Sequence, residues 1–315
     1  MAGISRTVLP GAVHESPRHY IRPCGFLRAE ERPATIEGPT AAGVSRVIGG
    51  ASREASWCWR LPLCRAGCRF IVLSVARAGA EVAQVTEPGA RVQAAEALAA
   101  GEIVVLPFNG IFVLVGDADD PAVSEKIAIV KQRPLSKGAA LVCPPEFLAE
   151  HVAVDAPRTS FTLPQVQALY QAVHAIGVIL QAARPGAPQH LVQAGTVLNV
   201  WTEQRPASPL RDLVLELRRR EHRALAGTSA NLSGRPTITD PAEVASVFGG
   251  RVPLILLDTF EAVPPRRRHS ASMVDLTGPV PRLVREGSVA AAELHAEMNR
   301  LELGELAVSP GVPRV

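Results

Sequence analysis

Aromatic residues, cysteines and long apolar runs are all scarce in this 315-residue chain. Aromatic side chains make up 4% of the residues and only five are cysteines. No apolar run reaches the ~18–20 residues of a membrane span, so we expect no membrane partner. The cysteines at 58, 64 and 68 lack the second Cys or His pair of a typical structural zinc site. We therefore predict reduced thiols and no metal site.

The common nucleotide and hydrolase motifs are also missing. There is no GxxxxGK[ST] loop, no GxGxxG after a strand and no GxSxG turn. Histidines do not pair at metal-ligand spacing, and the carboxylates suggest no catalytic pair. The formal net charge of +3 and the pI near 8.7 permit a local phosphate or RNA site without requiring one. Any chemistry is therefore expected to be electrostatic clamping of a nucleotide.

The chain divides into three parts by composition. Residues 1–82 are rich in Pro, Gly and Arg and predict a poorly ordered leader, with one strand-like piece at 70–76. Residues 83–290 predict the folded domain, and 291–315 a C-terminal helix and tail. No apolar signal segment follows the first charges, so a cytoplasmic location is expected.

Residues 83–290 mix helical and strand-like patterns without strict alternation. This predicts an α/β domain with a mixed sheet rather than a doubly wound parallel one. Helices are expected at 90–101, 121–134, 145–152, 163–177, 207–222 and 240–248. Strands are expected at 102–107, in a hairpin after it, and at 138–144, 177–183, 195–202, 225–231, 252–258, 272–278 and 280–287.

The first candidate site is the basic stretch KQRPLSK. Lys131 and Arg133 would share a side in extended backbone, and Lys137 could fold in across the loop. Three cations together can clamp a polyphosphate and offset the charge of phosphoryl or adenylyl transfer. The alternative is a solvated loop whose cations suit the helix C-terminus.

The second candidate is GTSANLSG at 227–234. If this stretch is extended, Ser229, Asn231 and Ser233 point to one side and offer donors and acceptors to ribose, phosphate or amino-acid groups. The alternative is an ordinary turn.

The third candidate lies near the C-terminal strand pair. Ser270 and Ser272 precede a strand and could bind phosphate, while Arg285 could equally be a surface ion-pair partner. The run Arg266–Arg268 is interpreted as an exposed loop.

In chain order, AAEALAAGEIVVLP, KQRPLSK, GTVLNV, TSANLSG, SMVDLTG and VREG resemble the YrdC-like family of threonylcarbamoyl-adenylate synthases, over about residues 88–290. The resemblance implies a twisted mixed sheet with flanking helices around a basic cavity. It also implies that L-threonine, bicarbonate and ATP, the last a substrate brought with Mg²⁺, form threonylcarbamoyl-AMP. The group is then used to modify adenosine 37 of tRNA. The family is also described as binding double-stranded RNA.

The resemblance implies roles for single residues. Lys131, Arg133 and Lys137 would be catalytic, and Ser229, Asn231, Ser272 and Arg285 would bind the nucleotide. The amino-acid side departs from the family pattern: Pro107-Phe108-Asn109-Gly110 stands where P-T-[DE]-T is usual. Val142 stands where the family has a His, and Val200 where it has an Arg.

Three functions remain open on this pattern. One is an enzyme that still forms an acyl- or carbamoyl-adenylate, on threonine or on another amino acid. The second is a non-catalytic module that binds nucleotide or RNA in its basic cavity. The third is a degenerate relative with no ligand.

Overall fold

The computed structural model describes residues 79–153, 161–173, 175–202, 209–308 and 311–313. The predicted strand-like piece at 70–76 and most of the predicted leader lie outside the described residues. The α-helices are α1 (Ala90–Ala99), α2 (Val123–Lys131), α3 (Leu163–Ala172), α4 (Pro209–Arg218), α5 (Pro241–Phe248) and α6 (Ala291–Arg300). The strands are β1 (Glu81–Gln84), β2 (Val104–Phe108), β3 (Ile111–Asp117), β4 (Ala140–Val142), β5 (Ala175–Gln181), β6 (Thr196–Thr202), β7 (Leu225–Ser229), β8 (Leu254–Leu257), β9 (Ser272–Asp275), β10 (Arg282–Arg285) and β11 (Ala307–Val308).

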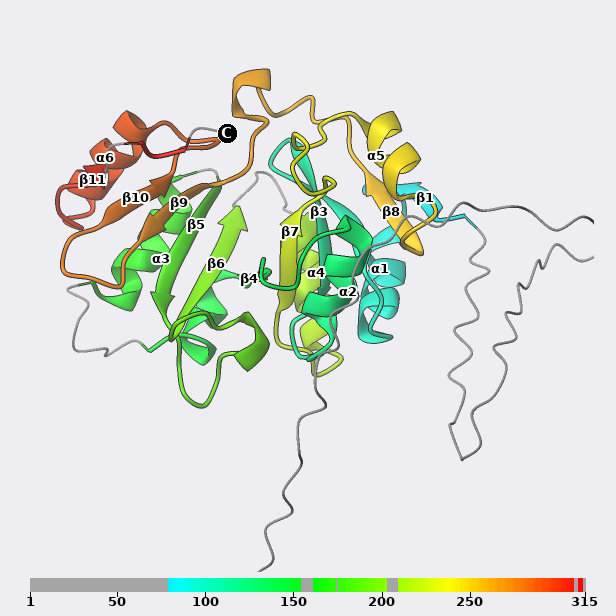
Figure 1. Ribbon diagram of the computed structural model, residues 1–315, viewed down its shortest axis with the longest axis horizontal. Coiled ribbons are helices and arrows are strands. Elements are labelled where there is room, and N and C mark those ends of the chain that lie inside the picture. The colour runs from blue at the N-terminus through cyan, green and yellow to red at the C-terminus, as the bar shows by residue number, and fades with distance from the viewer. Residues whose placement is uncertain (1–78, 154–160, 174, 203–208, 309–310, 314–315) are drawn as a thin grey trace, which may run out of the picture. The chain divides into compact units, whose positions relative to one another are not determined.

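All these strands join one sheet in the order β1-β8-β2-β3-β7-β4-β6-β5-β9-β10-β11 (Figure 1). Neighbours pair both ways: β2 with β3 and β5 with β6 are antiparallel, whereas β4 with β6 and β5 with β9 are parallel. The predicted mixed sheet is confirmed. The sequence did not indicate β1 and β11, which lie at the two edges of the sheet and are mostly exposed, so no apolar alternation marks them.

The β2–β3 hairpin turns on two residues, Asn109 and Gly110. Both have positive φ, 45° and 83°, which is the backbone of a type I′ turn. The register runs from Phe108 paired with Ile111 to Val104 paired with Val115. This tight turn fixes which side chains of β3 face each side of the sheet.

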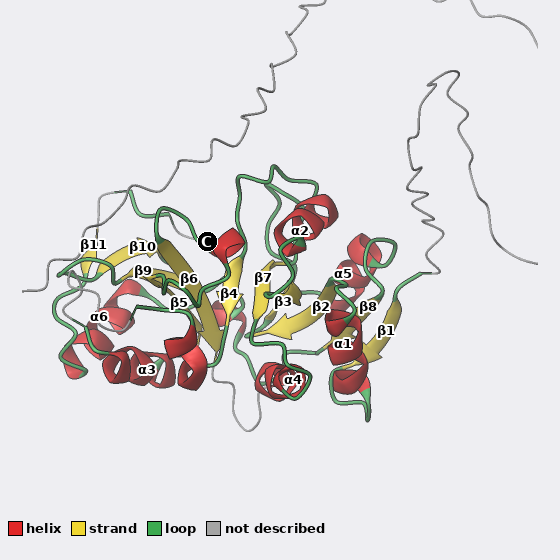
Figure 2. Ribbon diagram, turned by 90° about the horizontal axis from the view of Figure 1, so that it is seen from below, coloured by secondary structure: helices red, strands yellow, loops and turns green. Residues whose placement is uncertain are grey.

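The sheet has unequal cover on its two faces. Figure 2 shows α1, α3, α4 and α6 along one face, while α2 lies over the other. Strand β6 reflects this difference: Val197, Asn199 and Trp201 are fully buried, and Leu198 and Val200 are only half-buried. The half-buried side chains belong to the face on which the candidate site opens.

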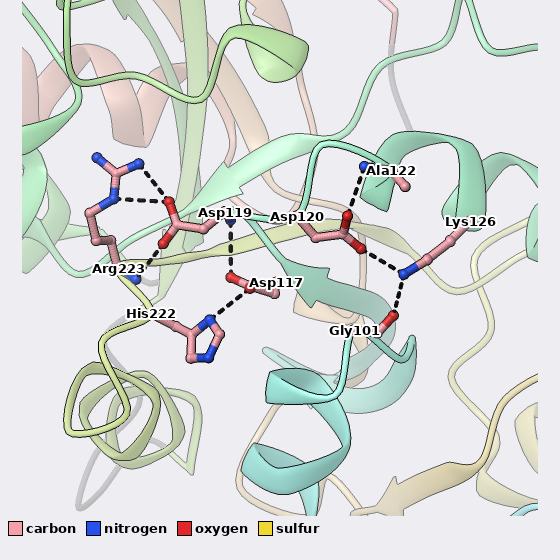
Figure 3. Close-up of polar contacts among 8 residues, drawn as sticks. All are labelled: Gly101, Asp117, Asp119, Asp120, Ala122, Lys126, His222 and Arg223. Carbon is pink, nitrogen blue, oxygen red and sulfur yellow. Dashed lines mark hydrogen bonds and ion pairs between the residues drawn. The ribbon is translucent and has the colours of Figure 1, made fainter.

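The loop after β3 is held by ion pairs (Figure 3). Asp117 contacts His222 at 2.7 Å, Asp119 accepts from the Arg223 guanidinium at 2.5 and 2.9 Å, and Asp120 accepts from Lys126 at 2.6 Å. Burial acts to raise the pKa of Asp119, but the bonds and charge of Arg223 outweigh it and hold that pKa below its usual value. Each carboxylate has a cationic or imidazole partner, so this cluster fastens β3 to the segment that precedes β7.

Several element boundaries differ from those predicted. The segment PEFLAE at 145–150 is a 3₁₀ helix, and α3 ends at Ala172, so that β5 already begins at Ala175. Alanine, glutamine and valine in QAVHAIG fit either state, and pairing with β6 decided the strand. The described residues contain no helix long and apolar enough to cross a membrane.

The predicted boundary at 290 stays a prediction. Leu294 and Met298 of α6 are fully buried in the same core as the sheet. Likewise, β1 pairs with β8 along Glu81–Gln84, across the predicted boundary at 82. Packing and pairing therefore continue through both predicted boundaries.

Candidate functional site

A cavity of about 270 Å³ is lined by residues of the sheet and of the loop that follows α2. We call it the basic cavity. Its walls are residues of β2, β3, β4, β6, β7 and β9 and of the segment before β9, together with two arginines. The lining residues are Phe108, Ile111, Val113, Arg133, Gly138, Ala140, Val142, Leu198, Val200, Gly227, Thr228, Ser229, Ser270, Ala271, Met273 and Arg285.

Lys131 is the last residue of α2 and is almost wholly buried, with 3% of its surface exposed. Its ammonium donates to the carbonyl of Ser229 and, at 3.0 Å, to Oδ1 of Asn231. Burial lowers the pKa of Lys131 to about 7, and the charges of Arg133 and Lys137 act in the same direction. Near neutral pH this side chain therefore exchanges between a charged and a neutral form.

The basic stretch and the TSANLSG segment lie against each other. The Arg133 guanidinium donates to Thr228 Oγ1 at 3.5 Å and to the Gly138 carbonyl at 3.2 Å, and Lys137 reaches Ser233 Oγ at 3.5 Å. The backbone N–H of Ser233 caps the carbonyl of Lys131 at 3.2 Å. Two segments about 100 residues apart, which were predicted as separate candidates, are thus in direct contact.

The predicted extended geometry is wrong for both segments. Lys131 and Arg133 do not share an extended strand, because Gln132 between them is in the left-handed region at φ 52° and ends the helix. Strand β7 stops at Ser229, so Ser229, Asn231 and Ser233 do not form a one-sided row.

Asn231 holds the turn that replaces the extended row. Its Oδ1 accepts from Lys131 and, at 2.7 Å, from Ser229 Oγ, while its Nδ2 donates to the carbonyls of Leu232 and Arg235. A four-way contact of this kind satisfies the amide completely and fixes the loop. Ser229 lines the basic cavity, and Asn231 stands behind it.

Arg285 reaches the basic cavity from β10, whereas Ser272 does not line it. The Arg285 guanidinium donates to the Ala271 carbonyl at 2.6 and 3.2 Å. The Ser272 hydroxyl is fully buried, donates to the Val289 carbonyl and accepts from the N–H groups of Gly287 and Val289. Its predicted contact with nucleotide stays a prediction; the bonds observed fasten β9 to the chain after β10.

Of the residues predicted on the amino-acid side, some line the basic cavity and others do not. Val142 lines the basic cavity, and a Cβ on Gly227 would lie 2.8 Å from its Cγ2, so Val142 packs directly on the β7 backbone. Pro107 and Asn109 are buried but do not line it. Their neighbour Phe108 does, as does Val200.

The basic cavity contains two guanidinium groups and no carboxylate among its lining residues. Burial lowers the pKa of both Arg133 and Arg285, and neither forms an ion pair with any residue the structure describes. An arginine stays protonated in proteins, so two partly buried charges here lack an anion. A carboxylate or phosphate would supply it.

A second cavity of about 250 Å³ adjoins the first and shares Gly138, Ala140, Leu198 and Met273 with it. We call it the side cavity. Its own lining is more polar and includes Ser136, Lys137, Gln193 and Thr196. Together the two offer room for more than one small ligand. No group of three or more His, Cys, Asp or Glu side chains able to hold a metal occurs among the described residues.

Fold and site together define a mixed α/β protein with an arginine-lined cavity between the sheet and the basic loop. The model of the Sua5/YciO/YrdC family, described as "Telomere recombination", matches residues 96–287, more than half of the chain. The chain belongs to this family, as the sequence resemblance predicted.

Two curated relatives are named threonylcarbamoyl-AMP synthase. A threonylcarbamoyl-AMP synthase of Actinobacillus succinogenes is 30% identical over 162 residues, covering 51% of this chain and 83% of its own. That of Vibrio campbellii is 28% identical over 170 residues, covering 52% and 84%.

Solved structures share the fold. P. abyssi Sua5 complexed with L-threonine matches with a TM-score of 0.53 at 20% identity, over 73% of this chain and 63% of that one. E. coli YciO matches with a TM-score of 0.54 at 20% identity, over 68% and 99%.

Sequence reasoning missed the apolar walls of the basic cavity. Ile111 and Val113 lie in a strand that is buried throughout, so its pattern gives no sign of a cavity. Leu198 could have been singled out from the sequence of β6. The apolar residues of this strand, Val197, Leu198, Val200 and Trp201, fall on both faces, which indicates that neither face is simply exposed to solvent. Thr228 stood next to a predicted residue and was not singled out.

Proposed function

We propose that this protein is a nucleotidyltransferase that joins an amino acid, bicarbonate and ATP into a carbamoyl-adenylate, as in threonylcarbamoyl-AMP synthesis. The observation that carries the proposal is the convergence of Arg133 and Arg285 on one cavity without a carboxylate counter-ion. The names of the curated relatives support the same reaction class.

The proposed reaction requires positive charge that no carboxylate of the protein neutralises. The amino nitrogen attacks the bicarbonate carbon and water leaves, which gives a carbamate. A carbamate oxygen then attacks the α-phosphorus of ATP. The bond from that phosphorus to the bridging oxygen breaks, and its electron pair leaves with pyrophosphate. Anion approaches anion in this step, so fixed cations lower the barrier.

The residues divide this work by position. Arg133 and Arg285 would hold the carboxylate and the α-phosphate in the basic cavity. Lys131, behind Ser229, would add charge when protonated, and Lys137 in the side cavity would face the outer phosphates. ATP would enter with its Mg²⁺ as a substrate. Transfer of the product group to adenosine 37 of tRNA is part of the proposal.

The test is ATP–pyrophosphate exchange with bicarbonate and single amino acids. We expect exchange by the full chain and a loss of about 100-fold in Arg133→Met, the typical effect of removing one preorganised electrostatic group. Arg91→Met is the matched control, because Arg91 is half-exposed and pairs with Asp212 on the surface. A folded protein that supports no exchange with any amino acid would contradict the proposal. Salt-sensitive binding of RNA by that inactive protein would favour the non-catalytic module instead.

A further inference from the structure

Part of the lining of the basic cavity is a hydrocarbon wall. Ile111, Val113, Val142, Leu198 and Val200 come from three strands and turn only carbon toward the space. Val113 and Val142 are themselves 8% and 5% exposed, so this wall is packed rather than loose. A ligand that fills the cavity therefore places an apolar part here.

The hydroxyl groups of the lining belong to Thr228, Ser229 and Ser270, and each already takes part in a hydrogen bond within the protein. Thr228 Oγ1 accepts from Arg133, Ser229 Oγ donates to Asn231, and Ser270 Oγ contacts Thr237 Oγ1 at 3.1 Å. A ligand hydroxyl packed against the five hydrocarbon side chains would lose its bonds to water and gain none from them. Such an unsatisfied hydroxyl is costly, whereas a methyl group in its place is favoured.

We infer that the basic cavity selects an L-amino acid with a branched apolar side chain of about valine size, in preference to threonine. The inference rests on the proposed function and names its substrate class. The carboxylate end lies on the guanidinium groups, which also meet the α-phosphate, and the hydrocarbon wall holds the side chain. Valine and threonine have the same shape and differ only by a methyl in place of the hydroxyl. A comparison of the two therefore tests only the polarity of the group that contacts the wall.

The decisive experiment compares L-valine with L-threonine on the full chain. We expect kcat/KM for ATP–pyrophosphate exchange to be at least about tenfold higher with valine, the scale on which a hydrophobic pocket discriminates. Calorimetry of each amino acid, in the presence of bicarbonate and a non-hydrolysable ATP analogue, should give the same order of affinity.

A variant pair ties the preference to the wall. Val142→Thr keeps the volume and adds a hydroxyl, so the valine-to-threonine ratio should fall several-fold. Val82→Thr makes the same change on β1, where the side chain is 48% exposed, and should leave the ratio unchanged. If Val142→Thr does not fold, Val200→Thr tests the same wall.

The two proposals fail differently. Exchange that proceeds equally well or better with threonine would overturn the inference and leave the proposed function standing. Absence of exchange with every amino acid would overturn the proposed function. In that case, tighter binding of valine than of threonine would still support the inferred selectivity of the wall. Equal or undetectable binding of both amino acids would contradict that selectivity.

Discussion

The fold changes the charge state of Lys131 by burying its ammonium group. Its ammonium is enclosed by α2, Ser229 and Asn231, and its pKa of about 7 lies far below the ordinary value for lysine. Between pH 7 and the ordinary pKa, the folded protein holds this lysine mostly neutral while the unfolded chain holds it charged. A bound anion reverses that preference, because it stabilises the ammonium.

ATP binding is therefore expected to take up a proton at pH 8. As pH rises above 7, affinity should fall by up to about tenfold per unit, the limit for one coupled proton. Calorimetry at pH 8 in two buffers of different ionisation enthalpy measures the uptake. Lys131→Met should abolish it. Lys126→Met, which removes an ammonium paired with Asp120 outside both cavities, should not. Equal proton uptake in the Lys131 variant would assign the effect to another group.

The β2–β3 hairpin is the element that sets the apolar wall in place. Its two-residue turn fixes the register of β3, and with it the side chains of Ile111 and Val113 that line the basic cavity. The Asn-Gly pair is visible in the sequence as a turn signal. Which face of β3 meets a cavity is not visible there, because every residue of the strand is buried.

Gly110→Ala should destabilise the protein by about 2–3 kcal/mol. The substitution forces an L side chain into positive φ, and its Cβ would lie 2.7 Å from Arg268 Cγ and 2.9 Å from Val263 Cγ1. Gly250→Ala is the matched control, since a Cβ there meets nothing within 4 Å and its φ is not strained. Urea unfolding of both variants checks the difference. Similar losses in the two would show that the turn carries no special strain.

At the scale of the whole molecule, the sheet runs from β1 to β11 and encloses one core. Edge strand β1 pairs with β8, and its Ala83 and the Val85 that follows it are buried. The predicted leader boundary at 82 would cut through this strand. The sheet is therefore expected to need every residue of β1 for its full stability.

Two truncations test this expectation. A chain that begins at residue 79 keeps β1 and serves as the reference. A chain that begins at residue 86 loses β1 and should be less stable by about 2 kcal/mol or more, since the burial of a valine side chain alone contributes that much. If both truncations unfold alike, β1 contributes nothing to the core.

The sequence by itself determined the family, the mixed α/β class and the cationic residues, because short motifs in a fixed order and strand-helix patterning are local properties. It also located Lys131, Arg133, Val142, Ser229 and Arg285, which the fold brings to the basic cavity or just behind it. Local pattern failed for the edge strands β1 and β11 and where a segment was judged extended. The physical reason for the missed strands is that a mostly exposed edge strand shows no apolar alternation.

Only the tertiary structure decided what those residues face. It placed TSANLSG against the end of α2 and the Ser272 hydroxyl in contact with backbone groups. It also brought hydrocarbon side chains and two guanidinium groups without an ion-pair partner among the described residues to one cavity. Each result depends on contacts between segments far apart in the chain, such as the ~100 residues between Lys131 and Asn231. Such contacts form when the whole sheet packs, so the shape and polarity of a cavity cannot be inferred from one segment alone.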